Sequence, residues 1–133
     1  MEQLNFDSGV KEYQINGKGI LRFNPSDPNV FARFMDSAEK IRQVEKEMVA
    51  KANALNRNSD IAGEEVLAIM RETDQKMKAI LNEIFGHEND FDKILENVNL
   101  MAVASNGERV ITNLIAALQP IMEGGAKACV GTE

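Results

Sequence analysis

Two periods of apolar residues divide the chain near residue 24. Up to residue 23, apolar side chains recur at every second position in three pairs: Leu4 and Phe6, Tyr13 and Ile15, and Leu21 and Phe23. A period of two is typical of a β-strand with one buried face. From residue 28 onwards the spacing changes to three and four residues, which is typical of helices. The chain therefore reads as a short β part followed by a long helical part.

Two turn-forming segments separate the apolar pairs of the β part. Asn16-Gly17 tolerates the positive φ angles of a tight hairpin turn, so we expect strands near residues 10 to 15 and 18 to 23 to pair antiparallel. Asp7-Ser8-Gly9 allows a further turn before them. A piece of this size is marginal alone. We expect a β-hairpin or a three-stranded β segment over residues 1–24 that packs on the helices.

The first helix has the best-defined start. Asp27 is placed to cap it, and Pro28 fits the first helical position, where a missing N–H costs nothing. One face carries an apolar seam with a spacing of seven, formed by Phe34, Ile41, Met48 and Leu55. On the opposite side the spacing of four predicts ion pairs Asp36/Lys40 and Glu47/Lys51.

A second long helix follows the polar stretch at residues 56–60 and ends at Gly86. Its apolar face alternates spacings of four and three: Val66, Met70, Thr73, Met77, Ile80 and Ile84. Two long helices joined by a short polar turn predict an antiparallel helical hairpin.

Two more helices complete the expected fold. Phe91, Ile94, Leu95 and Val98 predict a shorter helix in the region 90–99, and a last helix follows Gly107. We expect an α+β fold, mainly α, with four helices in one domain: the β segment 1–24, a helical body 25–123 and a flexible tail 124–133.

Composition excludes several classes of function. A net charge of −6 and a pI near 4.9 argue against nucleic-acid binding, which needs gathered Lys and Arg side chains. No run of apolar residues approaches the roughly 20 that span a membrane. The N-terminus lacks the pattern of a signal peptide, and the single Cys129 has no partner for an intrachain disulfide. These features predict a cytosolic protein without a membrane or nucleic-acid partner.

The sequence offers no group of residues typical of catalysis or metal binding. His87 is the only histidine, so no histidine pair can bind zinc and no Ser-His-Asp triad can form without it. Glu88, Asp90 and Asp92 lack the glycine and the final glutamate of an EF-hand loop, and acidic residues are expected at the start of a helix in any case. We therefore predict no catalytic residue, no bound metal and no cofactor.

The apolar seam of the first helix has two interpretations. It faces the protein's own core, or it lies partly open to another subunit, because a helix this long can extend beyond a small domain. The chain contains seven methionines and few aromatic residues, and methionine adapts well to varied partner surfaces.

Several short motifs resemble those of one group of viral proteins. Leu4-Asn5-Phe6, Glu12-Tyr13-x-Ile15-Asn16-Gly17 and Phe23-Asn24-Pro25-Ser26-Asp27 resemble the openings of small proteins of tailed bacteriophages and prophages of Gram-positive bacteria. Ile84-Phe85-Gly86, followed by an acidic stretch and Phe91, is similar to a pattern of their tail assembly chaperones. Residues 113–120 also fit that pattern.

The resemblance implies a non-enzymatic protein that acts in the cytoplasm of the bacterial host. Tail assembly chaperones bind the tape measure protein and tail tube protein while the tail is built, and we expect a homo-oligomer. The alternative is a phage structural or host-factor-binding helical protein. For either, we predict a set of apolar side chains as partner contacts: Phe31, Phe34, Ile41, Met48, Met70 and Met77.

Overall fold

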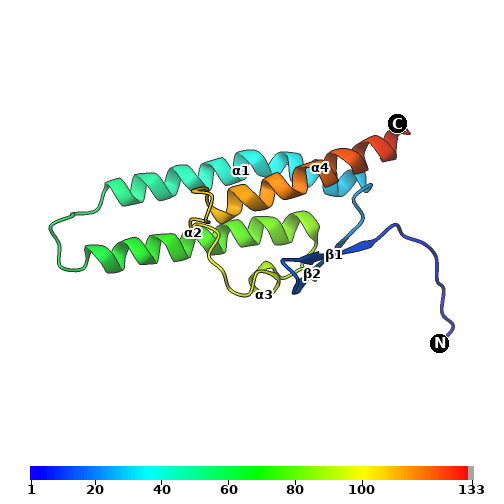
Figure 1. Ribbon diagram of the computed structural model, residues 1–133, viewed down its shortest axis with the longest axis horizontal. Coiled ribbons are helices and arrows are strands. Elements are labelled where there is room, and N and C mark those ends of the chain that lie inside the picture. Colours follow the sequence, from blue (N-terminus) through cyan, green and yellow to red (C-terminus); the bar gives the residue numbers. More distant parts are fainter. Residues whose placement is uncertain (132–133) are drawn as a thin grey trace.

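Strands β1 (Lys11–Ile15) and β2 (Gly19–Phe23) form an antiparallel hairpin in the computed structural model, which describes residues 1–131. Asn16 and Gly17 have positive φ angles of 50° and 79°, as the tight turn requires. The expected hairpin is confirmed. Within residues 1–131 there is no third strand, and residues 1–10 form an extended arm that runs away from the helices (Figure 1).

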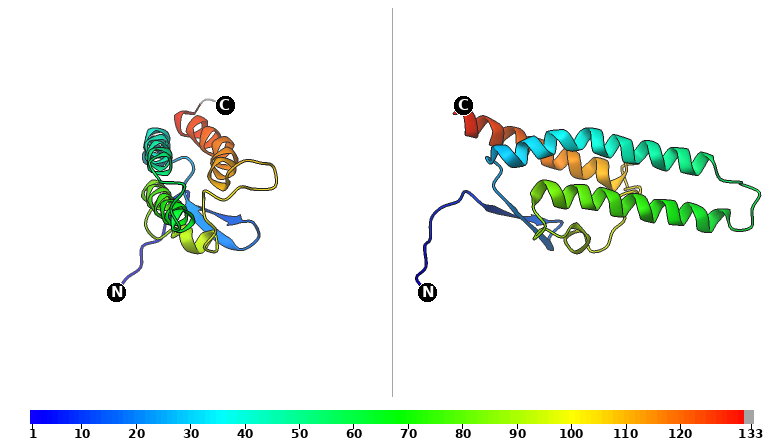
Figure 2. Two further views of the ribbon diagram at one scale, coloured as in Figure 1. Left: turned by 90° about the vertical axis from the view of Figure 1, so that its left-hand side faces the viewer. Right: turned by 180° about the vertical axis from the view of Figure 1, so that it is seen from behind.

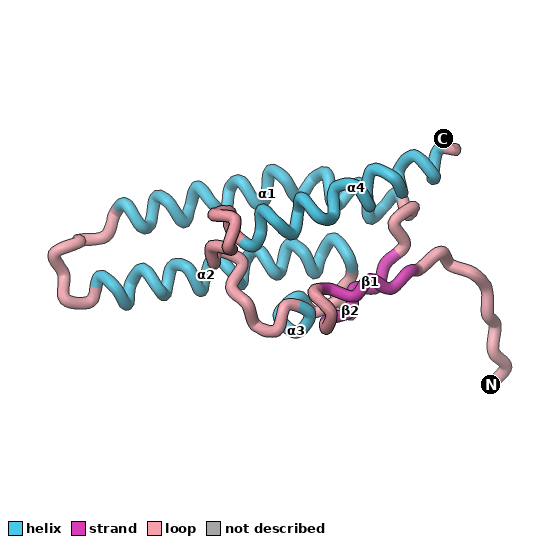
Figure 3. The backbone as a smooth tube through the Cα atoms, in the orientation of Figure 1, coloured by secondary structure: helices cyan, strands magenta, loops and turns pink. Residues whose placement is uncertain are grey.

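Helices α1 (Pro28–Asn53) and α2 (Ala62–Phe85) form the expected antiparallel hairpin (Figure 1). Asp27 caps α1, since its side chain accepts a hydrogen bond of 2.9 Å from the Asn29 N–H. The turn at residues 54–61 lies at one end of the molecule (Figure 3), which we call the distal end. The opposite end, where α1 begins, is the proximal end.

The ion pairs expected within α1 are wrong, because the neighbouring helix supplies the partners. Lys40 lies 3.5 Å from Glu83, and Lys51 lies 3.0 Å from Glu72. Glu47 lies 3.2 Å from Lys76. These ion pairs therefore link α1 to α2.

The third helix is shorter than expected, and the fourth is longer. Helix α3 (Phe91–Ile94) ends early because Glu96 and Asn97 adopt positive φ angles of 53° and 63°, which no α-helix accommodates. Helix α4 (Val110–Val130) continues well past residue 123. The flexible tail expected from residue 124 is therefore wrong for the residues up to Val130, while residues 132–133 lie outside the described part of the chain.

Close packing explains why α4 continues. Gly125 is buried against the backbone carbonyl of Pro25, at a distance that leaves no room for a Cβ atom. One residue earlier, Gly124 faces open space. The segment 124–130 is small and glycine-rich, which predicted fraying, but Gly125 allows α4 to approach the segment that precedes α1.

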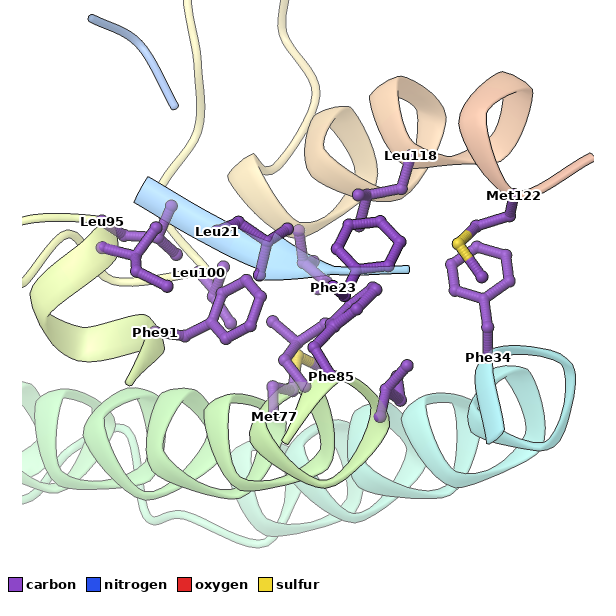
Figure 4. Packing of buried hydrophobic residues seen from close by; sticks show 14 of the residues in the cluster. Leu21, Phe23, Phe34, Met77, Phe85, Phe91, Leu95, Leu100, Leu118 and Met122 are labelled. Atoms are coloured by element: carbon purple, nitrogen blue, oxygen red, sulfur yellow. The ribbon is translucent and has the colours of Figure 1, made fainter. Parts of the chain in front are cut away.

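The elements on the proximal half of the helical hairpin enclose the core. Helix α4 and the β-hairpin lie on the same side of the α1–α2 pair (Figure 2), and α3 packs on α2 and β2. Aromatic rings of Tyr13, Phe23, Phe85 and Phe91 follow one another with centroids 4.7 to 5.8 Å apart. Figure 4 shows Phe23 and Phe85 side by side, and Met122 of α4 against Phe34 of α1.

Two buried polar groups fasten the connections to this core. The Asp74 carboxylate accepts hydrogen bonds from the Lys78 ammonium at 2.9 Å and from the Leu100 N–H at 2.7 Å. Lys78 also donates to Asp92 at 2.6 Å. Asn89 is 3% exposed and bonds the backbone of Arg22 on β2 and the Phe85 carbonyl at the end of α2. Asp74 thereby anchors the connection around Leu100 to α2, and Asn89 anchors the loop after α2 to the end of that helix and to β2.

Candidate functional site

The distal part of the helical hairpin extends beyond the other elements (Figure 1). It carries exposed apolar side chains. Four of them define what we call the distal surface: Val49, Ile61, Val66 and Leu67. Leu67 is the most exposed of the four, at 63%. Val49 lies on α1, Ile61 just before α2, and Val66 and Leu67 on α2. Exposed apolar groups gathered at one end of a molecule are candidates for a protein interaction site.

The distal surface begins where the connection between α3 and α4 stops covering α2. Asn99 donates a hydrogen bond of 3.4 Å to the Met70 carbonyl, and Leu100 bonds Asp74 one turn further on. Leu67 lies one turn before Met70 on the same stripe of α2. Near the beginning of α2 the connection no longer covers the helix, and Leu67 is 63% exposed. The apolar stripe of α2 therefore continues into solvent.

A groove of about 280 Å³ lies between the end of α1 and the start of α2, next to this surface. Ala52, Ala62 and Gly63 leave space that longer side chains would fill. Leu55 and Val66 add larger apolar groups to the lining, and Arg57 is its one charged residue. The hollow can accept an apolar side chain from a partner.

Charged side chains mark the proximal limit of the distal surface. Glu72 lies between Lys51 and Lys76, at 3.0 and 3.1 Å. Hydrogen bonds from Lys51 and then from Lys76 lower the pKa of the Glu72 carboxyl below its ordinary value. Hydrogen bonds to Glu72 and then to Glu47 raise the pKa of the Lys76 ammonium. These exposed pairs keep the two helices in register without closing the surface beyond them.

The six side chains predicted to contact a partner differ in how deeply they are buried. Phe34, Met48 and Met77 are buried, and Met77 is fully inaccessible, so none of these three is available to a partner in this conformation. Ile41 and Met70 are half-buried against the core. Phe31 is half-buried and lines an apolar pocket of about 200 Å³ between the start of α1 and the end of α4.

Sequence reasoning selected the seam residues because they repeat regularly, and regular repetition marks the buried face. Three residues of the distal surface, Val49, Ile61 and Leu67, lie outside that pattern, whereas Val66 belongs to it. Val49 follows the seam residue Met48 directly, and Leu67 follows Val66. An apolar residue next to the seam, on a face otherwise rich in charge, was the signal that could have identified them.

The acidic and histidine side chains considered for chemistry lie around the end of α2 and the start of α3. His87 is exposed at the end of α2. Within residues 1–131, no group of three or more His, Cys, Asp or Glu side chains is placed to hold a metal ion. Cys129 is exposed on α4. None of the helices in the described part of the chain is both long enough and apolar enough to cross a bilayer.

Comparison with known proteins adds no relative. No protein-family model matches the sequence. No curated protein matches it, and no solved structure matches the fold.

Proposed function

We propose that this protein is a bacteriophage or prophage tail assembly chaperone that binds helical segments of the tape measure protein through its distal surface. One observation supports the proposal most: a rigid helical hairpin extends beyond the core and carries Val49, Ile61, Val66 and Leu67 exposed on it. The motifs around residues 4–27 and 84–91, which resemble those of tail assembly chaperones, support the same reading.

A third helix laid across the end of the hairpin would bury these side chains. Complete burial of a Val or Leu side chain is worth about 1.5–3 kcal/mol, so a half-exposed one has about 1 kcal/mol left to gain. A few such gains give reversible binding, because association and ordering costs offset part of them. Reversibility suits a chaperone that must release its client when the tail tube forms around it.

The proposal extends to the other features implied by the resemblance. The tail tube protein is a second partner, the protein acts as a homo-oligomer, and its place of action is the cytoplasm of the bacterial host. It performs no catalysis. Acidic residues outnumber basic ones by six, which favours solubility during assembly.

Copurification with the tape measure protein encoded in the same genome tests the proposal. Leu67→Glu should weaken binding at least tenfold, since it places a charge in the apolar contact. Val103→Glu is the matched control: Val103 is 65% exposed, much like Leu67, but lies outside the distal surface. Circular dichroism confirms that both variants fold.

Two results would contradict the proposal. One is the absence of binding by the unmodified protein, and the other is equal binding by Leu67→Glu and the unmodified protein. Mass spectrometry of purified virions adds a separate readout. Persistence of the protein in finished particles would favour the alternative of a structural component over a chaperone.

A further inference from the structure

The two edges of the β-hairpin differ in how they are covered. The outer edge of β2 is closed by Asn89, which accepts a hydrogen bond of 2.9 Å from the Arg22 N–H and donates one of 2.8 Å to the Arg22 carbonyl. Arg22 lies opposite Glu12. Because the Arg22 backbone bonds Asn89, the N–H and C=O groups of this pair point away from the partner strand. By the same alternation, the backbone N–H and C=O groups of Glu12 and Gln14 point outward from β1.

This outer edge of β1 is open. In the part of the chain that the structure describes, no hydrogen bond from outside the hairpin reaches the backbone of Glu12 or Gln14. An open edge presents unpaired donors and acceptors in the spacing of a strand, and it is a template for another strand. Natural proteins add strands to such edges from extended peptide segments.

A groove adjoins the open edge. It measures about 450 Å³ and lies between the end of β1 and the first half of α4. Its apolar lining comes from Ile15, Leu95 and three side chains of α4: Val110, Leu114 and Ala117. Gln14, Asn16 and Asn113 add polar groups to the lining. A strand added to β1 would therefore place every second side chain next to the apolar part of this groove.

The N-terminal arm has the properties of such a strand. Leu4 and Phe6 are spaced by two residues and are 87% and 79% exposed. The arm is fixed at its base, where the Asn24 side chain donates a hydrogen bond of 3.0 Å to the Ser8 carbonyl. From this anchor residues 1–7 run away from their own helices (Figure 1), and their apolar side chains contact none of the core.

We propose that residues 1–7 of one copy pair antiparallel with the open edge of β1 in a second copy, with Leu4 and Phe6 directed into the groove against α4. Residues directly opposite each other in a sheet share a face. Pairing Leu4 with Ile15 and Phe6 with Tyr13 covers two side chains that are only half-buried in one copy. Each copy offers one arm and one edge, so reciprocal exchange closes a dimer.

This register also places Asp7 opposite Glu12. Like charges opposite each other weaken a sheet. Here Arg22 lies 3.5 Å from the Glu12 carboxylate on the neighbouring strand and offsets part of that repulsion.

Light scattering after size exclusion, over a range of concentrations, tests the exchange. The unmodified chain of 14.7 kDa should reach twice that mass. Deletion of residues 1–7, or Phe6→Asp, should weaken association at least tenfold without unfolding the protein, because the arm is outside the core. Ile20→Asp is the control, since Ile20 is 51% exposed on β2 and takes no part in the exchange.

A mixing experiment separates the arm from the edge. Gln14→Pro removes an outward N–H of β1, a position where an edge strand tolerates proline. The arm-deleted chain keeps its edge and Gln14→Pro keeps its arm, so neither should dimerise alone. Mixed, they should form a heterodimer with one exchanged arm.

A mass that stays monomeric for the unmodified chain, or a dimer that survives deletion of the arm, would overturn the proposal. The arm and the distal surface lie at opposite ends of the molecule (Figure 1). Binding of the tape measure protein by the arm-deleted chain can therefore be measured separately, and failure of the arm exchange leaves the proposed binding at the distal surface standing.

Discussion

Asn89→Asp should destabilise the protein in a way that depends strongly on pH. Asn89 is 3% exposed, and its amide group donates hydrogen bonds to the carbonyls of Arg22, at 2.8 Å, and Phe85, at 2.7 Å. Its oxygen accepts one from the Arg22 N–H. The substitution keeps the size and this acceptor, but turns the donating group into an oxygen that faces two other oxygens.

The cost follows from the protonation state of the new carboxyl group. A buried carboxylate beside two carbonyls is so unfavourable that the group takes up a proton in the folded state, which means that its pKa is raised. Protonation at pH 7 costs about 4 kcal/mol, since the ordinary pKa of about 3.9 lies three units lower and each unit is worth about 1.4 kcal/mol. The acid can donate to one carbonyl only, so a further hydrogen bond of about 1 kcal/mol is lost.

The expected loss is therefore about 5 kcal/mol at pH 7 and about 2.5 kcal/mol at pH 5. The sign follows because folding of the variant takes up a proton above the ordinary pKa of the group, so its stability falls as the pH rises. Urea unfolding followed by circular dichroism at both pH values measures the difference. The measurement at pH 5 remains possible even if the variant is largely unfolded at pH 7.

Asn89→Ala provides the comparison. It removes all three hydrogen bonds but introduces no titrating group, so its cost of about 2–4 kcal/mol should hardly change with pH relative to the unmodified protein. The reasoning would be refuted by an Asn89→Asp variant that loses less than about 1 kcal/mol, or whose deficit is the same at pH 5 and pH 7. Either result would mean that water reaches this side chain.

Four further substitutions test the packing and a helix cap, each measured as the free energy of unfolding in urea. Lys78→Met should cost about 3–5 kcal/mol, because it leaves the buried Asp74 carboxylate without its cation. Gly125→Ala should cost about 1–3 kcal/mol by forcing α4 away from the segment before α1, whereas Gly124→Ala, with open space around it, should stabilise by about 0.5–1 kcal/mol. Asp27→Ala should cost about 1 kcal/mol through loss of the cap of α1.

The elements that the sequence predicted best are those whose signals are local. Asn16-Gly17 specifies its own turn through two positive φ angles, and Asp27 with Pro28 specifies the start of α1. The long helices were predictable because their apolar period is sustained over many turns. The antiparallel pairing of α1 with α2 followed from the shortness of the turn between them.

What the sequence could not reveal depends on contacts between distant segments. From the sequence alone, Gly125 looks like a helix breaker. In the structure, the backbone carbonyl of Pro25 occupies the space that a side chain at residue 125 would fill. Lys78 and Asp74 look like a surface pair at a spacing of four until the Leu100 backbone is seen to cover them. Three of the six predicted partner contacts, Phe34, Met48 and Met77, are buried. Met122 of α4 packs against Phe34, a contact between distant segments that the sequence does not reveal.

The separation of the two ends of the molecule has a practical consequence for labelling. Cys129 is the only cysteine in the sequence, and it is exposed near the proximal end. The turn at residues 54–61 lies at the far end of α1, whose 26 residues span about 39 Å at 1.5 Å per residue. The native thiol therefore accepts a spin label or a fluorophore well away from the distal surface. A second label on that turn would convert client binding and subunit exchange into two distinct distance signals.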